Sequence, residues 1–538
     1  IVFRIKNKLT NSPDSIMNKI ILYIFCLINI CLINAQNKAP NIIYILADDM
    51  GIGDVSAYNK TSKINTYNID ALAKQGIKFT DYHTSSSVCT PTRYGILTGR
   101  YAWRSRLKNG VTHGFSTNLI ETNRTTVASY LKTKGYNTAV IGKWHLGMNW
   151  SRTNDKKINI KEGRNVDFNK KIKNGPNTFG FDYYYGISAS LDMPPYAYIE
   201  NNMIKGNLSY AEDKSIFKEL NMKPVRLGWI SENFNQEAVV SNLEKKAISW
   251  IIKQNTNTPN KPFFLYLPLT APHAPIVPSD KFKGKSNLSA HGDFCLEIDA
   301  LVGKISTTLD KLNITDNTLI VFTSDNGVSP NANLKAMENK KHYSSHIYRG
   351  LKGTLYEGGH RMPFILKWPK GIAKQTTSDK LTCSTDFLAT IMDLNNDKPE
   401  EHNAEDSVSF LSEFNGENKS DISRGAIVHH SDNGYFSIRE GKWKLIFHSG
   451  AGSRRKDPKD LPVENPNKLQ LFNLDKDVKE KTNIIALYPE KTAYLTRLMA
   501  KLINNGRSTD GIKQKTIPFK GEKQLLKLQA FKKYLSLK

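Results

Sequence analysis

Oxygen-bearing side chains follow two apolar runs of this 538-residue chain. Asp48 and Asp49 come directly after residues 41–47 (NIIYILA), and Asp325 and Asn326 closely follow residues 319–323 (LIVFT). Each run is typical of a buried parallel strand, and the carboxyl ends of such strands meet at one edge of a sheet. Any one Asp or Asn after a strand is commonly a turn residue. Four together predict a site for a hard divalent cation.

A cysteine opens the most specific segment of the chain, residues 89–100 (CTPTRYGILTGR). Pro91 suits the first turn of a helix, because proline lacks an N–H and its φ is already helical. The free amides and the dipole of that helix would then face an anion beside Cys89. Arg93, one turn further on, is placed to hold anion oxygens through charge-assisted hydrogen bonds. The plainer interpretation of this segment is a structural cysteine before a helix.

Two lysines and two histidines lie in short segments rich in glycine or proline. Lys143 and His145 lie in GKWHLG, where the alternation of an extended chain predicts both side chains on one face. His273 lies between prolines in APHAP. Lys352 lies in RGLKGTLYEGGHRMP, whose glycines permit close approach of the backbone. Taken singly, each of these side chains would be interpreted as a surface residue.

From about residue 41 to residue 368, these ordered segments resemble the type I (formylglycine-dependent) sulfatases, arylsulfatase-like members of the alkaline phosphatase superfamily. The resemblance implies a sulfuric ester hydrolase in which a separate formylglycine-generating enzyme converts Cys89 to formylglycine (3-oxoalanine). It also implies a divalent metal, usually calcium. The implied metal ligands are Asp48, Asp49, Asp325, Asn326 and the converted Cys89.

The same resemblance implies a mechanism. The hydrated aldehyde at position 89 presents one hydroxyl that attacks sulfur, helped by calcium and Asp325, and a second hydroxyl that later expels the bound sulfate. His273 protonates the leaving oxygen, and His145 takes the second hydroxyl proton so that the aldehyde re-forms. The arginine and both lysines neutralise charge on the sulfuryl oxygens. The catalytic residues are thus predicted to be Cys89, Arg93, Lys143, His145, His273 and Lys352.

The elements around these residues are expected to alternate between strand and helix. Residues 138–141 and 263–267 have strand patterns, and residues 69–76 and 294–312 have helical ones. This alternation predicts an α/β fold with a large mixed or parallel sheet sandwiched by helices, which is also the alkaline-phosphatase-like fold that the resemblance implies. The polar residues 149–177 are expected to form an insertion or surface loop.

A catalytic domain is predicted over residues 37–395, followed by a smaller C-terminal α+β subdomain over residues 396–538. The subdomain is expected to contain an antiparallel hairpin (435–438 and 443–447), a helix with proline near its start (489–502) and a basic tail (513–538). Cys295 and Cys383 are expected to be ordinary buried thiols, with a disulfide between them as the alternative.

The start of the chain predicts export. Residues 17–35 combine a lysine, an apolar core and a final small residue, the pattern of a signal peptide, and residues 1–16 are expected to be an upstream extension. No apolar run reaches the roughly 20 residues of a spanning helix, so no integral membrane segment is predicted. A secreted or periplasmic protein follows. A lipid anchor at Cys31 is the weaker alternative, because the residues before it fit a lipidation signal poorly.

The expected partner is a sulfated carbohydrate, either a polysaccharide or its oligosaccharides. A formal net charge of +26 favours polyanions, although general enrichment in lysine explains it equally well. The sequence has no nucleic-acid-binding motif. Asp192 and Trp103 are candidate sugar contacts, each equally open to a structural role. Two alternatives stay open: a phosphodiesterase or phosphonate monoester hydrolase on the same fold, and a noncatalytic polyanion-binding protein.

Overall fold

The computed structural model describes residues 39–220, 222–223, 225–415, 424–454 and 469–517. The expected upstream extension (1–16), the signal peptide (17–35) and most of the basic tail (518–538) lie outside the described residues. No helix in the described part of the chain is both long enough and apolar enough to cross a membrane.

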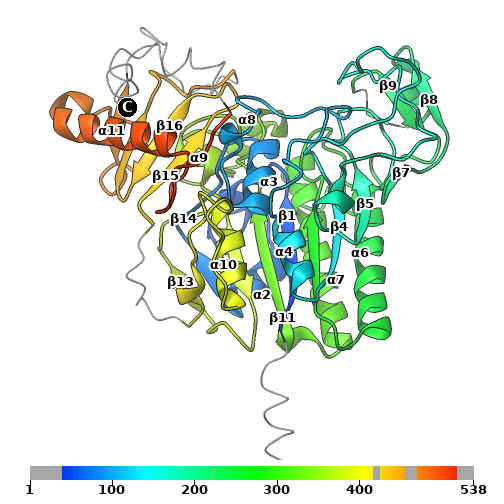
Figure 1. Ribbon diagram of the computed structural model, residues 1–538, viewed down its shortest axis with the longest axis horizontal. Coiled ribbons are helices and arrows are strands. Elements are labelled where there is room, and N and C mark those ends of the chain that lie inside the picture. The colour runs from blue at the N-terminus through cyan, green and yellow to red at the C-terminus, as the bar shows by residue number, and fades with distance from the viewer. Residues whose placement is uncertain (1–38, 221, 224, 416–423, 455–468, 518–538) are drawn as a thin grey trace, which may run out of the picture.

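A ten-stranded mixed sheet forms the centre of the protein (Figure 1), with the order β13-β2-β12-β11-β1-β10-β4-β5-β6-β7. The parallel strands at its middle are β11 (Thr318–Ser324), β1 (Asn41–Ala47), β10 (Phe263–Pro268), β4 (Asn137–Lys143) and β5 (Tyr183–Ile187). The outer strands are β13 (Thr376–Ser378), β2 (Ile77–Phe79), β12 (Phe364–Lys367), β6 (Ile199–Glu200) and β7 (Met203–Ile204). Both β12 and β6 pair antiparallel with each of their neighbours.

Alternation along β1 explains why helices cover both faces of this sheet. Ile43 and Ile45 belong to one buried hydrophobic cluster, whereas Ile42 and Tyr44 belong to another. The first cluster is covered by α2 (Tyr67–Lys74), α6 (Val239–Asn257) and α7 (Ala290–Lys311). The second is covered by α3 (Cys89–Thr98), α4 (Val127–Thr133) and α10 (Phe387–Leu394). The result is a layer of helices on each side of the sheet (Figure 1).

A second, antiparallel sheet of four strands follows, with the order β15-β16-β17-β18. Its elements are β15 (Ala426–His430), β16 (Phe436–Glu440), β17 (Trp443–Ile446), β18 (Gln470–Asn473) and the adjoining α11 (Pro489–Asn505). These pack around their own buried cluster, which includes Ile438 and Leu495. Shorter elements are β3 (Tyr82–His83), β8 (Leu208–Ala211), β9 (Gly228–Ser231), β14 (Thr382–Cys383), α5 (Ser215–Glu219), α8 (Leu334–Asn339) and α9 (Glu357–His360).

The predicted fold class is confirmed: a large mixed sheet between helices, with a small antiparallel sheet after it. The largest boundary error lies at α7, which begins four residues before the predicted residue 294. The reason is Ser289, whose side chain accepts a hydrogen bond from the Gly292 N–H and so caps the helix earlier. Cys295 and Cys383 are both buried free thiols, so the alternative of a disulfide between them is wrong.

Candidate active site

The predicted oxygen ligands converge at the carboxyl edge of the main sheet. β1 and β11 are neighbours in register, with Ala47 opposite Ser324, so the residues that follow each strand meet. The Asn326 Nδ2 donates to Asp49 Oδ1 at 2.7 Å, and the Asp49 N–H donates to Asp325 Oδ1 at 3.2 Å. Asp49 adopts a left-handed conformation (φ 70°), an unusual backbone state that is enriched at functional sites.

Cys89 is the first residue of α3 and points toward this carboxylate group. Its Sγ lies 3.6 Å from Asp48 Oδ1, and its side chain is almost completely buried. One turn further on, the Arg93 guanidinium donates to Asp325 Oδ2 at 2.8 Å and to the Lys143 carbonyl at 2.9 Å. All ten residues of α3 are buried, so the helix holds Cys89 and Arg93 at fixed positions.

Buried cations pair with the carboxylates. Lys143 Nζ lies 2.6 Å from Asp48 Oδ2, and Lys352 Nζ lies 2.5 Å from Asp49 Oδ1. Burial alone would raise the pKa of Asp48, but the charges of Lys143, His273 and Arg93 bring it well below its ordinary value. Asp325 behaves differently, because burial and the charge of Asp48 together raise its pKa to about 7.

Two histidines complete the group. His273 Nδ1 contacts the Ala274 carbonyl at 2.6 Å, which turns Nε2 toward Asp49 Oδ2, 3.7 Å away. His145 Nε2 contacts the Thr112 carbonyl at 2.8 Å, while its buried Nδ1 has no hydrogen-bond partner. The expected extended path from Lys143 to His145 is wrong, because His145 has a φ of 56° and turns the chain. Burial lowers the pKa of both imidazoles.

The residues around the carboxylates fit a hard cation. Asp49 Oδ2 and Asn326 Oδ1 are both buried without a hydrogen-bond partner. Ligand atoms of Asp48, Asp49, Cys89 and His273 all lie within 4.8 Å of one another. Buried oxygens with unused lone pairs, such as those of Asp49 and Asn326, are what a calcium ion would satisfy.

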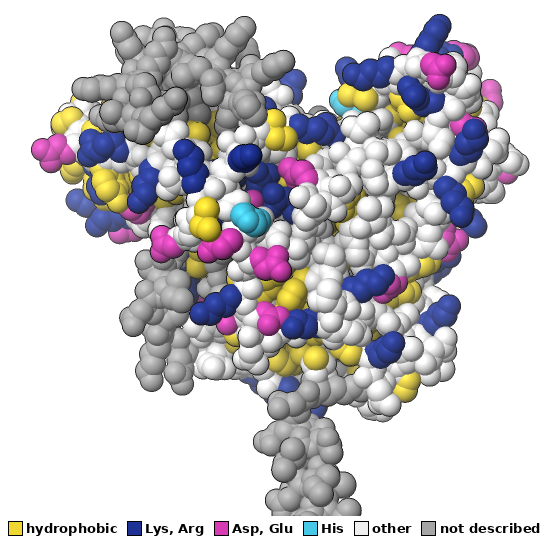
Figure 2. Space-filling model, in the orientation of Figure 1, with side chains coloured by type: hydrophobic (Ala, Val, Ile, Leu, Met, Phe, Trp, Pro, Cys, Tyr) yellow, Lys and Arg dark blue, Asp and Glu magenta, His cyan; other side chains and the backbone are white. Residues whose placement is uncertain are grey.

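A cavity of about 550 Å³ opens above Cys89. Cys89, His145, His273 and Lys352 all line it, so four predicted catalytic residues share one space. Asn109, Lys161 and Arg226 reach the cavity from loops of the main-sheet part of the chain. Arg454 comes from the C-terminal unit, by which we mean the four-stranded sheet β15–β18 with α11 and the loops between them. Figure 2 shows the surface hollowed between the lobe of β8 and β9 and the lobe of β15, β16 and α11, with Lys and Arg side chains near the hollow.

Of the two candidate sugar contacts, the structure places only one in this cavity. Asp192 lines the cavity, next to Met193. Trp103 is fully buried in the core of the C-terminal unit, where its ring stacks on Tyr101 and meets Phe436 edge-on, so it is not a sugar contact. Sequence reasoning did not commit to several lining residues, because none of them belongs to a motif: Asn109, His113, Lys161, Ser190, Arg226 and Arg454.

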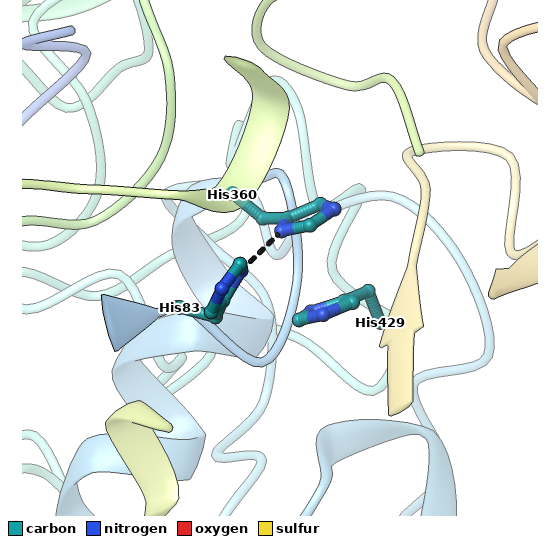
Figure 3. A group of neighbouring side chains, drawn as sticks. All are labelled: His83, His360 and His429. Carbon is teal, nitrogen blue, oxygen red and sulfur yellow. Dashed lines mark hydrogen bonds between the residues drawn. The ribbon is translucent and has the colours of Figure 1, made fainter. Parts of the chain in front are cut away.

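A second buried group of possible metal ligands joins the two units of the chain. His83 on β3, His360 on α9 and His429 on β15 each place a ring nitrogen within 4.8 Å of the others. His83 Nδ1 and His360 Nδ1 form a 3.0 Å hydrogen bond (Figure 3). Lys444 Nζ lies 3.2 Å from His360 Nε2, and Arg439 Nη1 lies 2.8 Å from His83 Nε2. Resident cations on two of the three rings disfavour a metal ion, so we interpret the group as structural.

This chain is also similar to known proteins in sequence and fold. The family model described as Sulfatase matches residues 40–396. The N-acetylgalactosamine-6-O-sulfatase of Bacteroides thetaiotaomicron is 35% identical to this chain over 503 residues, which cover 87% of this chain and 94% of that protein. A structure solved in work on the metabolism of multiple glycosaminoglycans by that species has a TM-score of 0.76 at 34% identity, covering 87% of this chain and 99% of its own. The crystal structure of Ps i-CgsB with k-i-k-neocarrahexaose has a TM-score of 0.61 at 25% identity, covering 88% and 95%.

Proposed function

The chain belongs to the sulfatase family, and we propose that it removes sulfate from a sulfated glycan using a formylglycine made from Cys89 and a calcium ion. The hydrolysis of sulfuric esters follows from membership of this family. The observation that best supports the rest is the position of Cys89. It begins a buried helix at the floor of a cavity, 3.6 Å from Asp48 Oδ1, and shares that cavity with Lys352 and His273.

Two groups absent from the structure supply part of the proposed chemistry. The hydrated aldehyde of formylglycine would provide one hydroxyl to attack sulfur and a second to release the sulfate. Calcium would add positive charge beside the sulfuryl oxygens. Its ligands would be Asp48, Asp49, Asp325 and Asn326, supported by the two unpartnered buried oxygens of Asp49 and Asn326.

The other site residues hold the ester and move protons. Arg93, Lys143 and Lys352 are buried cations next to position 89, suited to charge that develops on sulfuryl oxygens. His273 keeps Nε2 toward the site, because Nδ1 is engaged by the Ala274 carbonyl, and so would protonate the leaving alcohol oxygen. The unpartnered Nδ1 of His145 would accept the proton that is released when the aldehyde re-forms.

A glycan is the proposed substrate, and 6-O-sulfated N-acetylgalactosamine is the first candidate sugar. The support is the similarity to the N-acetylgalactosamine-6-O-sulfatase of Bacteroides thetaiotaomicron, together with a cavity of about 550 Å³, which is larger than a simple aryl ester needs. We also propose that the protein is exported to the periplasm or cell exterior, on the signal-peptide pattern of residues 17–35.

The test combines mass spectrometry with sulfate release. Purified protein, co-expressed with a formylglycine-generating enzyme, is digested to find the aldehyde in the Cys89 peptide. Released sulfate is then measured on 6-O-sulfated N-acetylgalactosamine oligosaccharides, carrageenan oligosaccharides and 4-nitrophenyl sulfate, and released 4-nitrophenol is measured on bis(4-nitrophenyl) phosphate. We expect formylglycine and the fastest turnover on a glycan. Faster turnover of the phosphodiester would support the phosphodiesterase alternative, and glycan binding by the matured protein without any sulfate release would support the noncatalytic one.

A further inference from the structure

One wall of the cavity above Cys89 carries two buried oxygens with no hydrogen-bond partner. They are Ser190 Oγ and Asp192 Oδ1, and both residues line the cavity. A turn holds this wall in place, because the Met193 N–H donates to the Ser190 carbonyl at 3.0 Å. A buried polar atom without a partner costs free energy, and such atoms facing a cavity indicate that a bound ligand supplies the missing hydrogen bond.

Arg226 fixes the orientation of the Asp192 carboxylate. Its Nη2 lies 3.1 Å from Asp192 Oδ2, which leaves Oδ1 for the cavity. The two segments are also tied together by the Tyr196 hydroxyl, which donates to the Arg226 carbonyl at 2.8 Å. Asp192 is thus a partly buried carboxylate with one oxygen paired and one oxygen available to a donor in the cavity.

Asp192 is also the only acidic residue among the described residues that line this cavity. Lys352 lines its floor, and Lys161, Arg226 and Arg454 line its sides, so cations dominate and favour anionic substrates in general. A carboxylate in this setting accepts a hydrogen bond from a neutral hydroxyl but repels a second sulfate placed at the same point. The Asp192 carboxylate therefore distinguishes a monosulfated sugar from a disulfated one, although the cations alone would bind both.

We propose that Asp192, held by Arg226, determines specificity by accepting a hydrogen bond from a free hydroxyl of the sugar whose sulfate is removed. Sugars that carry a second sulfate at that hydroxyl are excluded. Arg226 is a positioning residue that acts through Asp192. The inference rests on the proposed function, since it concerns how the same site selects among sulfated sugars.

The experiment compares two substitutions at one position. Sugars with a single 6-O-sulfate are paired with the same sugars bearing a further sulfate at each remaining hydroxyl in turn, and kcat/KM is measured for each. Asp192→Ala removes the acceptor and should lower kcat/KM on the monosulfated sugar by about 10- to 100-fold. Asp192→Asn keeps an acceptor oxygen but removes the charge. It should raise the relative rate on one disulfated sugar by about 10-fold or more.

Glu212→Gln is the matched control, because Glu212 forms an exposed ion pair with Arg164 at 2.8 Å and does not line the cavity. In Glu212→Gln, the ratio of kcat/KM on each disulfated sugar to kcat/KM on the monosulfated sugar should equal that of the wild type. If both Asp192 variants lost kcat/KM equally on monosulfated and disulfated sugars, the ratio between the two substrates would be unchanged. That result would overturn the inference while leaving the sulfatase proposal intact. A wild-type protein that carries formylglycine but releases sulfate from no sugar would instead refute the proposed function.

Discussion

Two regions of this protein bury charged groups in similar numbers, yet only one of these regions adjoins the cavity above Cys89. At the edge of the main sheet, three carboxylates face three cations: Asp48, Asp49, Asp325, Arg93, Lys143 and Lys352. Between the two units, carboxylates, histidines and cations form a second set: Asp81, His83, Glu357, His360, His429, Arg439, Lys444 and Glu480. Lys352 of the first set lines the cavity of about 550 Å³ together with Cys89 and His273, whereas no residue of the second set lines it.

The difference lies in what the protein itself already satisfies. Lys444 Nζ forms hydrogen bonds with Glu357 Oε1 at 2.9 Å and His360 Nε2 at 3.2 Å, and an ion pair with Glu480 Oε1 at 2.8 Å. In the first set, Asp49 Oδ2 has no hydrogen-bond partner, nor does the adjacent Asn326 Oδ1. In the second, His429 Nε2 and Glu480 Oε1 also lack a hydrogen-bond partner, but neither residue lines the cavity above Cys89. Buried charge alone therefore does not indicate a site, whereas an unpartnered carboxylate oxygen such as that of Asp49, in contact with the cavity-lining Lys352 and His273, does.

Removing the nucleophile should have the largest effect. Cys89→Ala should lower kcat by at least about 10⁴-fold while substrate still binds, because the cations that hold the ester remain. Ion chromatography of released sulfate and calorimetric binding measure the two properties. Cys295→Ala, at a buried thiol in α7, is the control and should keep kcat near the wild-type value. Full activity in Cys89→Ala would refute the assignment of the nucleophile.

Lys444→Ala should cost stability. Without this ammonium, the carboxylates of Glu357 and Glu480 stay buried together, and the free energy of unfolding should fall by about 3–5 kcal/mol. Denaturant unfolding measures the loss. An unchanged midpoint would show that the second set does not hold the two units together.

Lys352→Ala should mainly cost activity. Its ammonium lines the cavity next to Cys89, and its loss should lower kcat/KM by about 10²- to 10³-fold. The unfolding midpoint of Lys352→Ala should shift less than that of Lys444→Ala, because a bound cation can still neutralise the charge of the Asp49 carboxylate. A larger stability loss in Lys352→Ala than in Lys444→Ala would reverse the comparison between the two regions.

Metal content should separate the regions directly. Elemental analysis should find about one calcium per chain, and chelation should lower the free energy of unfolding by about 2.7 kcal/mol if calcium was present at 100 times its Kd. Asn326→Ala should weaken calcium retention, whereas His360→Ala should not change it. Zinc that co-purifies with the wild type and is lost in His360→Ala would make the histidine group a metal site.

The smallest effect should be the dependence of stability on pH. Burial, then the charges of neighbouring His83 and Lys444, lower the pKa of His429 well below the unfolded value of about 6.5. The folded protein therefore binds fewer protons than the unfolded chain, so stability is fully present above about pH 6.5 and is lost as pH falls through the folded pKa. His429→Gln should flatten this fall by at most about 1.4 kcal/mol per pH unit.

The sheet and the strand-end carboxylates could be predicted because their signals are local. Residues 41–47 form an apolar run that is followed at once by two aspartates. This pattern predicts both the strand and the point where the strand ends. The turn at His145 could not be predicted, because a φ of 56° is imposed by its surroundings and not by the motif. The sequence left both a sugar contact and a structural role open for Trp103, because its ring packs against Phe436, more than 300 residues away in the sequence.

Asp192 was a candidate sugar contact from the sequence, but its partner in the cavity wall could not be predicted for the same reason. Asp192 and Arg226 lie on different loops, and nothing near either residue in the sequence indicates that they pair. Arg454 reaches the cavity from the C-terminal unit, so its place depends on how that unit packs. Residues in dense motifs, such as Cys89, His145 and Lys352, can be grouped from the sequence, whereas the pairing of residues from separate loops depends on long-range packing.

The burial of α3 also sets an order of events in the life of the chain. Cys89 is 2% exposed, and every residue of its helix is packed. A maturation enzyme has to bind the cysteine segment as an accessible peptide, so the conversion that we propose must be completed before α3 docks. Folding and oxidation therefore compete in time, and any molecule that folds first keeps its thiol. The yield of active protein is then governed by the ratio of two rates, which slower folding or more maturation enzyme would shift.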